Sequence, residues 1–148
     1  MIKTICNFNI KSPYTTSWLQ SIANRLSQKE KKIKGEVEIT IVGDKEMTEL
    51  NWLYRGKNYP TDVLSFAWQE DNKIKTKMLG QIYVCYPQIK RQAKDWGVKE
   101  NEEMARMLIH GLLHLVGHDH HEKKQAKKMF KIQEGIIENL GYVTQKFD

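Results

Sequence analysis

One segment of the sequence, residues 101–117, is apolar on nearly every side of the helix that it would form. Its apolar residues are Met104, Met107, Leu108, Leu112, Leu115 and Val116. A helix of this kind cannot face water along most of its circumference, so it belongs inside the molecule. We expect Asn101 to cap it, with Glu102 and Glu103 in a first turn whose dipole favours negative charge. Glycine readily takes the left-handed conformation, so Gly117 ends the helix.

The periodicity of the remaining chain predicts the elements that surround this buried helix. Period-two alternation of apolar residues indicates strands over 2–8, 36–43, 62–68 and 80–86. Helical spacing indicates helices over 15–28, 44–54, 86–96 and 122–140. Asp44 is expected to cap the second of these, whose apolar stripe would run on to Leu53 and Tyr54. The order β-α-β-α-β-β-α-α-α predicts an α+β fold with a mixed sheet of about four strands packed with helices.

Composition restricts the kind of protein further. The 148 residues contain no repeat, low-complexity tract or linker, so residues 1–148 are expected to form a single domain. Lys and Arg exceed Asp and Glu by 24 to 18, a net charge of +6 that favours polyanionic partners. Cys6 and Cys85 form no CxxC pair, which indicates a reducing cytoplasm. The N-terminal residues lack the apolar core of a signal peptide, and no apolar stretch is long enough for a membrane.

All five histidines lie within twelve residues, 110–121. His110 and His114 are four residues apart, so both rings project from one face of the buried helix. Because Gly117 reverses the chain, His120 can reach the same point. Three neutral imidazoles with one open position make a catalytic zinc site, with one Zn²⁺ per chain and a bound water whose pKa falls to about 7. The alternative is a group of hydrogen-bonded core or surface histidines.

The other residues of the cluster have a simpler interpretation. His118 and His121 lie off the ligand spacing, and a tetrahedral site has only four positions, so we interpret both as structural. Asp119 either orients a ligand by a hydrogen bond to its ring or belongs to the turn. The zinc site is therefore predicted on the central buried helix and the turn that follows it.

The same ligand spacing occurs in metzincin proteases, which carry a glutamate directly after the first histidine to activate water. Gly111 occupies that position here. Without the carboxylate the peptidase mechanism loses its proton acceptor. The spacing of the histidines therefore still predicts a metal site, but it no longer favours a protease.

Two motifs resemble those of the YbeY-type endoribonucleases. Residues 110–120, HGLLHLVGHDH, match the family's H-G-x-L-H-L-x-G-x-D-H segment, and residues 50–66, LNWLYRGKNYPTDVLSF, match its N-x2-[YF]-R-x4-P-T-D-V-L-S-F stretch. The segments LGQIYVC and ENLGY are similar as well, so the resemblance covers nearly the whole chain. Gln81 replaces the family's usual aspartate and Ala67 its usual proline, and the first change puts a carboxylate role on that strand in doubt.

The resemblance implies a zinc-dependent endoribonuclease that acts on single-stranded RNA. It implies small-subunit rRNA 3′-end processing and ribosome quality control, with the small ribosomal subunit and its assembly factors as partners. The zinc ligands would be His110, His114 and His120, and Arg55 and His114 would belong to the catalytic centre.

The residue chemistry agrees with this implication. Phosphodiester cleavage builds negative charge on oxygens, and arginine is a permanently charged, two-pronged phosphate ligand, so Arg55 is our candidate. The alternative interpretation of Arg55 is a solvated residue at a helix end. The neighbours Trp52, Tyr54, Lys57 and Tyr59 either stack a base and hold the backbone or pack in the core. Lys123 and Lys124 follow the third ligand and could guide RNA, although most such runs are solvated faces.

The sequence leaves the attacking nucleophile and the function open. Attack by zinc-bound hydroxide and attack by the ribose 2′-OH are both compatible with the sequence. So are a hydrolase of another substrate on the same zinc frame, and a non-catalytic ribosome-assembly factor whose zinc is structural.

Overall fold

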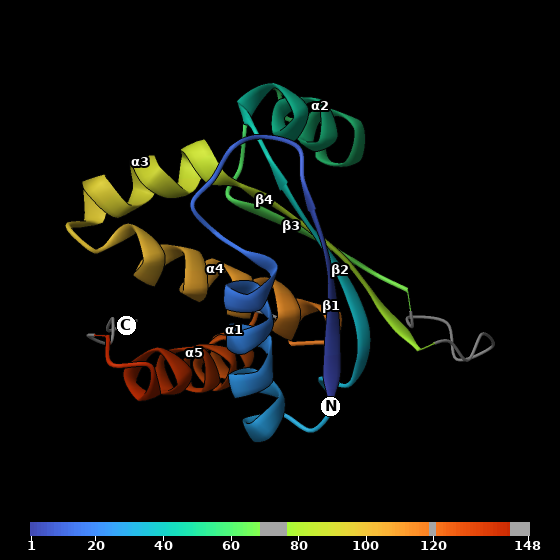
Figure 1. Ribbon diagram of the computed structural model, residues 1–148, viewed down its shortest axis with the longest axis vertical. Helices are drawn as coiled ribbons and strands as arrows, with labels where there is room; N and C mark the ends of the chain where they lie inside the picture. The colour runs from blue at the N-terminus through green and yellow to red at the C-terminus, as the bar shows by residue number, and fades with distance from the viewer. Residues whose placement is uncertain (69–76, 119–120, 143–148) are drawn as a thin grey trace.

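The computed structural model describes residues 1–68, 77–118 and 121–142. Its nine elements follow the predicted order and confirm the α+β class (Figure 1). In chain order they are β1 (Ile2–Phe8), α1 (Thr16–Lys29), β2 (Gly35–Val42), α2 (Asp44–Arg55), β3 (Val63–Ala67), β4 (Met78–Cys85), α3 (Tyr86–Trp96), α4 (Glu100–Leu115) and α5 (Lys123–Asn139). Residues 69–76, between β3 and β4, lie outside the described residues.

The four strands form one mixed sheet in the order β1-β2-β4-β3. β1 pairs with β2 and β2 with β4 in parallel, whereas β3 pairs antiparallel with β4. Side chains alternate between the two faces of a strand, so Ile39, Ile41, Ile82 and Val84 all enter the same core. The helices α1, α3, α4 and α5 lie on that side of the sheet, and α2 packs on a second core at one end of the sheet, where it also contacts α3 (Figure 1).

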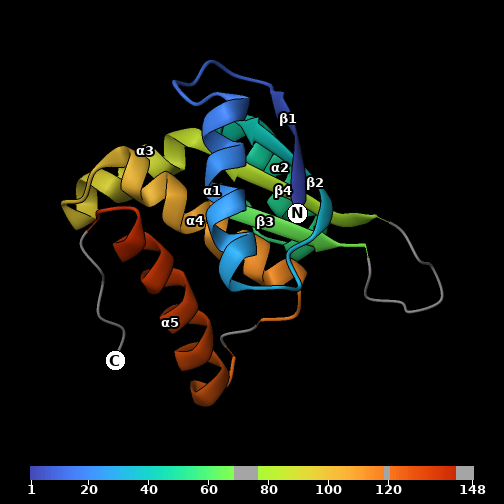
Figure 2. The same cartoon turned by 60° about the horizontal axis from the view of Figure 1, so that its bottom comes forward.

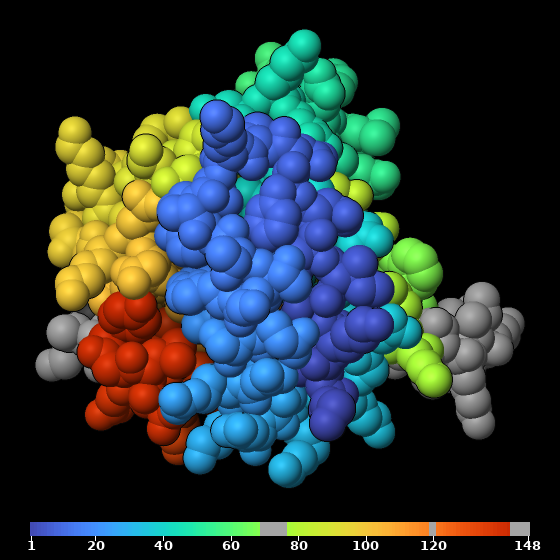
Figure 3. Space-filling model, in the orientation of Figure 1, coloured from blue at the N-terminus to red at the C-terminus, as the bar shows by residue number. Residues whose placement is uncertain are grey.

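The helix α4 is the centre of the fold, as the sequence predicts. It contacts β3 and β4 on one side and α1, α3 and α5 on the others (Figure 2). Leu108 and Leu112 on α4 have no exposed surface, and the helix stops at Leu115 before Gly117, whose φ is 93°. Only part of α4 reaches the face drawn in the space-filling view, where α1 covers the middle of the molecule (Figure 3).

Two predicted helix caps are wrong. Asp44 is the first residue of α2 and Gly43 is its N-cap, because the Asp44 carboxylate instead bonds Arg91 on α3 at 2.7 and 2.9 Å. Asn101 lies inside the first turn of α4, which starts one residue earlier after Lys99. In both places the boundary moves by one or two residues while the helix itself is as predicted.

The structure excludes the core alternative for Leu53 and Tyr54. Leu53 is 72% and Tyr54 59% exposed, while Met47 and Asn51 are the residues of α2 that are buried. The helix packs through its first half against a small second core on the outer face of the sheet, so its last turn extends beyond that core. Tyr54 keeps a tilted ring contact there, with its ring centroid 4.6 Å from that of Phe66.

None of the helices within the described ranges has both the length and the apolar character that a bilayer crossing requires.

Candidate metal centre and cleft

The site is organised by the close approach of α4 to β3 at Gly111. A Cβ added at Gly111 would lie 3.1 Å from both Ser65 Oγ and Val63 Cγ2, closer than side chains normally pack. The Ser65 hydroxyl donates a hydrogen bond to the Gly111 carbonyl at 3.0 Å, which joins helix and strand directly. The position where a metzincin has its glutamate is therefore filled by the strand and has no room for a longer side chain.

Beside this contact an open cleft of about 650 Å³ separates α4 from the segment that leads into β3. Its wall combines residues from three distant parts of the chain, and this is where Arg55 at the end of α2 comes to share a cavity with His110 and His114. The other lining residues are Thr61, Asp62, Val63, Leu64, Ser65, Ala67, Met107, Leu115 and His121.

The two imidazoles of α4 face each other. His110 Nε2 and His114 Nε2 are 3.0 Å apart, and the rings are nearly perpendicular at 81°. Zinc–nitrogen bonds of about 2.0–2.1 Å in a tetrahedral site place neighbouring ligand nitrogens roughly 3.3 Å apart. The pair therefore fits two positions of a zinc site with only a small adjustment of the rings.

The far side of His110 is fixed by a residue that the sequence analysis missed. His110 Nδ1 lies 2.9 Å from Oε1 of Gln133 on α5, and Gln133 is only 1% exposed. Histidines that bind metals commonly donate their second ring nitrogen to such an acceptor, which orients the ring. A signal was present, because Gln133 interrupts the apolar face of the last helix and a buried amide needs a partner.

The third predicted ligand, His120, and the neighbouring Asp119 lie outside the described residues. Among residues 1–68, 77–118 and 121–142, no three His, Cys, Asp or Glu side chains gather closely enough to hold a metal ion. The ligand set His110, His114 and His120 therefore stays a prediction, of which the structure describes two members.

The two histidines outside the ligand spacing have different surroundings. His118 Nε2 lies 2.8 Å from Glu30 Oε2, so this side chain joins the turn after α4 to the end of α1. Burial raises the pKa of the Glu30 carboxyl, but the bonds from His118 and from the Lys32 backbone outweigh burial and lower it overall. His121 lines the cleft, so a histidine that we interpreted as structural borders the candidate site.

The aromatic residues after Arg55 lie on the surface and are available to a ligand. Trp52 is 62% and Tyr59 54% exposed, and the Lys57 ammonium lies 5.9 Å from the centre of the Tyr59 ring. The buried Asn51 amide donates to the Tyr59 carbonyl at 2.8 Å, which fixes the course of this loop. Exposure excludes the core interpretation for these rings, while their contact with RNA stays a prediction.

Gln81 lies away from the cleft. Its neighbour Gly80 faces Leu115 on α4, so Gln81 points to the opposite face of the sheet. There its amide donates to Glu38 at 3.2 Å. In this chain the side chain at position 81 therefore contributes to the outer surface of the sheet and not to the cleft.

The fold and the site together define an α+β protein in which a pair of facing imidazoles and an arginine share one open cleft. The family model described as "Endoribonuclease YbeY" matches residues 3–141, and the chain belongs to that family. A protein named Endoribonuclease YbeY from Persephonella marina is 43% identical over 107 residues, 71% of this chain and 70% of the relative. One of the same name from a Sulfurihydrogenibium species is 36% identical over 127 residues, 85% of this chain and 84% of the relative.

A solved structure has the same architecture. The solution structure of a Thermotoga maritima protein superposes with a TM-score of 0.63 at 29% sequence identity, covering 95% of this chain and 89% of that one.

Proposed function

We propose that this chain is a zinc-dependent endoribonuclease that cleaves single-stranded RNA. The observation that carries the proposal is that Arg55 and the facing pair His110–His114 line one open cleft. The name of the family, Endoribonuclease YbeY, supports an RNA substrate.

The residues of the cleft have three roles in this proposal: metal binding, phosphate binding and restriction of the phosphate's position. His110, His114 and the predicted third ligand His120 would hold one Zn²⁺, which supplies Lewis-acid stabilisation of charge on a phosphoryl oxygen. Arg55 binds the phosphate through two parallel hydrogen bonds. Asp62 is held as an acceptor, because its two oxygens receive the Val63 amide at 2.7 Å and the Gln92 amide at 3.2 Å. Its negative charge confines the phosphate to the side of the cleft near Arg55 and the histidines.

As a biological role we propose 3′-end processing of small-subunit rRNA and ribosome quality control in the cytoplasm, with the small subunit and assembly factors as partners. The two family motifs and the net charge of +6 support this role. The exposed lysines at the start of α5, Lys123 and Lys124, would guide the RNA backbone toward the cleft. Replacing both with glutamate should flatten the salt dependence of RNA binding, by about 0.7 in log–log slope per lost phosphate contact. An unchanged slope contradicts this role for the two lysines.

The direct test is cleavage of a single-stranded RNA by the purified chain, with and without a zinc chelator, beside His114→Ala. We expect the chelator and the variant each to abolish cleavage, and His114→Ala to bind less zinc. His121→Ala is the matched control, since it removes a histidine of the same cleft outside the predicted ligand set and should leave zinc content unchanged. RNA cleavage that survives both chelator and His114→Ala would refute the catalytic metal.

The products identify the nucleophile. A 2′,3′-cyclic phosphate end shows attack by the ribose 2′-OH, whereas its absence from the earliest products shows attack by water. Cleavage of a peptide or an ester in place of RNA would identify a hydrolase of another substrate. Zinc binding without any cleavage would identify an assembly factor.

A further inference from the structure

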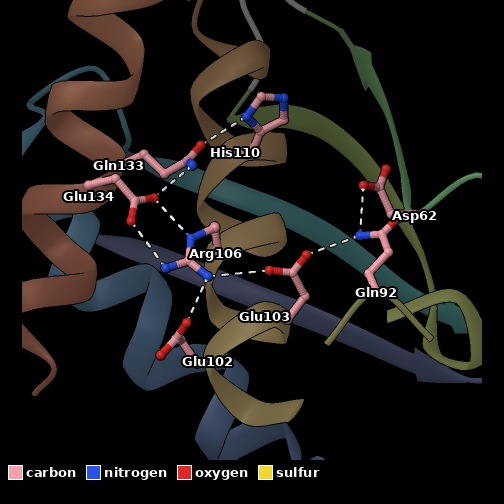
Figure 4. A network of polar contacts seen from close by, with 8 residues as sticks. All are labelled: Asp62, Gln92, Glu102, Glu103, Arg106, His110, Gln133 and Glu134. Atoms are coloured by element: carbon pink, nitrogen blue, oxygen red, sulfur yellow. Dashed lines mark hydrogen bonds and ion pairs between the residues drawn. The ribbon is translucent and has the colours of Figure 1, made fainter. Parts of the chain in front are cut away.

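We propose that Gln133 is a positioning residue that selects the metal-binding tautomer of His110, and that Arg106 and Glu134 fix the direction of its amide. The inference rests on the proposed function, because it assigns a role toward the same metal. It is carried by a network of hydrogen bonds and ion pairs that links α4 and α5 and reaches His110 (Figure 4).

The network starts at Arg106, which is 1% exposed and lies one turn before His110 on α4. Its Nε and Nη2 atoms donate to the two carboxylate oxygens of Glu134 on α5, at 2.9 and 3.1 Å. Its Nη1 atom donates to Glu102 at 3.0 Å and to Glu103 at 3.3 Å. Burial lowers the pKa of this guanidinium, but the bonds to Glu134 and Glu102 outweigh burial and raise it overall, so Arg106 stays charged.

The charge on Arg106 determines what Glu134 can do. A carboxylate bound by two guanidinium N–H groups is ionised and can only accept hydrogen bonds. Its Oε2 atom lies 3.0 Å from Nε2 of Gln133, so the amide nitrogen of Gln133 must be the donor. Turning the amide over would bring its oxygen against the carboxylate, which is repulsive in a buried site.

The orientation of the Gln133 amide then determines the proton on His110. With its nitrogen toward Glu134, the amide presents Oε1 to His110 Nδ1 at 2.9 Å. A carbonyl oxygen only accepts, so Nδ1 must carry the hydrogen. In the neutral ring Nε2 then has the lone pair, and Nε2 is the atom that faces His114 across 3.0 Å. The chain Arg106–Glu134–Gln133 thus prepares His110 as an Nε2 ligand.

The opposite branch of the network provides a control. Gln92 on α3 donates to Glu103 at 3.0 Å and to Asp62 at 3.2 Å. It is half-buried and has the same side chain as Gln133, but its hydrogen bonds join it to Glu103, Asp62 and Gln88 and not to His110 or Glu134 (Figure 4).

The experiment compares Gln133→Met, the exchange Q133E/E134Q and Gln92→Met with the unmodified chain. Two quantities are measured: the histidine tautomers in the zinc-free protein, by long-range ¹H–¹⁵N NMR, and the zinc affinity, by competition with a chromophoric chelator. Circular dichroism and thermal melting identify variants that are unfolded.

We expect Gln133→Met to lose the pure Nδ1–H tautomer of His110 and to bind zinc about 10–100-fold more weakly. Q133E/E134Q should restore the tautomer, because a carboxylate at 133 accepts from Nδ1–H. The amide at 134 donates to that carboxylate in place of accepting from Arg106 Nε, so this variant should also melt at a lower temperature. Gln92→Met should change neither quantity. A folded Gln133→Met variant with the original tautomer and zinc affinity would overturn the proposal, as would loss of the tautomer in Gln92→Met.

The outcomes separate this inference from the proposed function. The tautomer is read in the zinc-free protein without RNA, so it tests the hydrogen-bond direction even if the chain cleaves no RNA. Conversely, RNA cleavage that requires zinc, together with an unchanged tautomer in Gln133→Met, would support the function and refute the role of Gln133.

Discussion

The two halves of α4 belong to one apolar helix, but their polar side chains lie in different surroundings. In the first half Glu102, Glu103 and Arg106 are at most 5% exposed, and Arg106 bonds both glutamates. In the second half His110 and His114 border an open cleft. On this helix the polar residues with a structural role are buried, whereas the two histidines are half-buried and open to the cleft.

The comparison shows how one helix can carry both a buried structural network and residues that border an open cleft. Charges removed from water cost free energy unless each is paired and hydrogen-bonded, so the first half tolerates no missing partner. In the second half, α5 fixes one side of the His110 imidazole through Gln133. Because Gln133 and Glu134 are consecutive, α5 reaches both halves of α4 from a single turn.

The largest effect is expected from Arg106→Met. Removing the guanidinium leaves at least three carboxylates facing one another in a buried site, so the free energy of unfolding should fall by about 3–5 kcal/mol. Chemical denaturation at neutral pH measures this. Arg106→Lys keeps the positive charge but not the two-pronged geometry and should lie between the variant and the unmodified chain. If Arg106→Met lowered the free energy of unfolding by less than about 1 kcal/mol, the polar residues in the first half of α4 would not depend on their partners as the structure indicates.

A smaller effect is expected from Gly111→Val, which probes the approach of the second half to the sheet. The added carbon atoms would meet Ser65 and Val63 at a place where even a Cβ would be 3.1 Å away. Overpacking of this kind costs about 1–3 kcal/mol, and it should also widen the spacing between α4 and β3 that shapes the cleft. Denaturation and zinc affinity are the two measurements. Gly135→Val on α5 is the control, since no atom lies within 4 Å of an added Cβ there.

The smallest effect on the free energy of unfolding is expected from Arg91→Ala. This variant removes an ion pair at the surface whose bond lengths are similar to those of the buried Arg106 pairs. Arg91 bonds Asp44 at 2.7 and 2.9 Å, but the two side chains are 47% and 46% exposed. Water screens such a pair, so the loss should stay below about 1 kcal/mol. An equal loss for Arg91→Ala and Arg106→Met would remove the distinction between surface and buried pairing.

The surface pair also predicts a pH dependence with a definite sign. The bonds from Arg91 outweigh burial and lower the pKa of the Asp44 carboxyl below its usual value. The unfolded chain then binds a proton more readily than the folded one, so this stabilisation is present at neutral pH and is lost as the pH falls below the usual range of aspartate. Arg91→Ala should therefore be destabilised at neutral pH but approach the unmodified chain in acid, as melting curves across that range would show.

What the sequence by itself determined is the set of local features. The order of strands and helices, the buried character of α4 and the placement of His110 and His114 on one helix face follow from periodicity, because neighbouring turns of a helix are related by fixed geometry. The family motifs follow from the sequence in the same way, and the match to the family model over residues 3–141 confirms the assignment.

What only the tertiary structure decided is which distant segments meet. Arg55 reaches the histidines, Gln133 orients His110 and Arg106 is enclosed by carboxylates because particular helices pack together, and spacing along the chain does not specify that packing. For the same reason the sequence left Leu53 and Tyr54 open between core and surface. An apolar stripe shows which side of a helix can be buried, but the surface that the helix packs against decides how many turns of that side are buried.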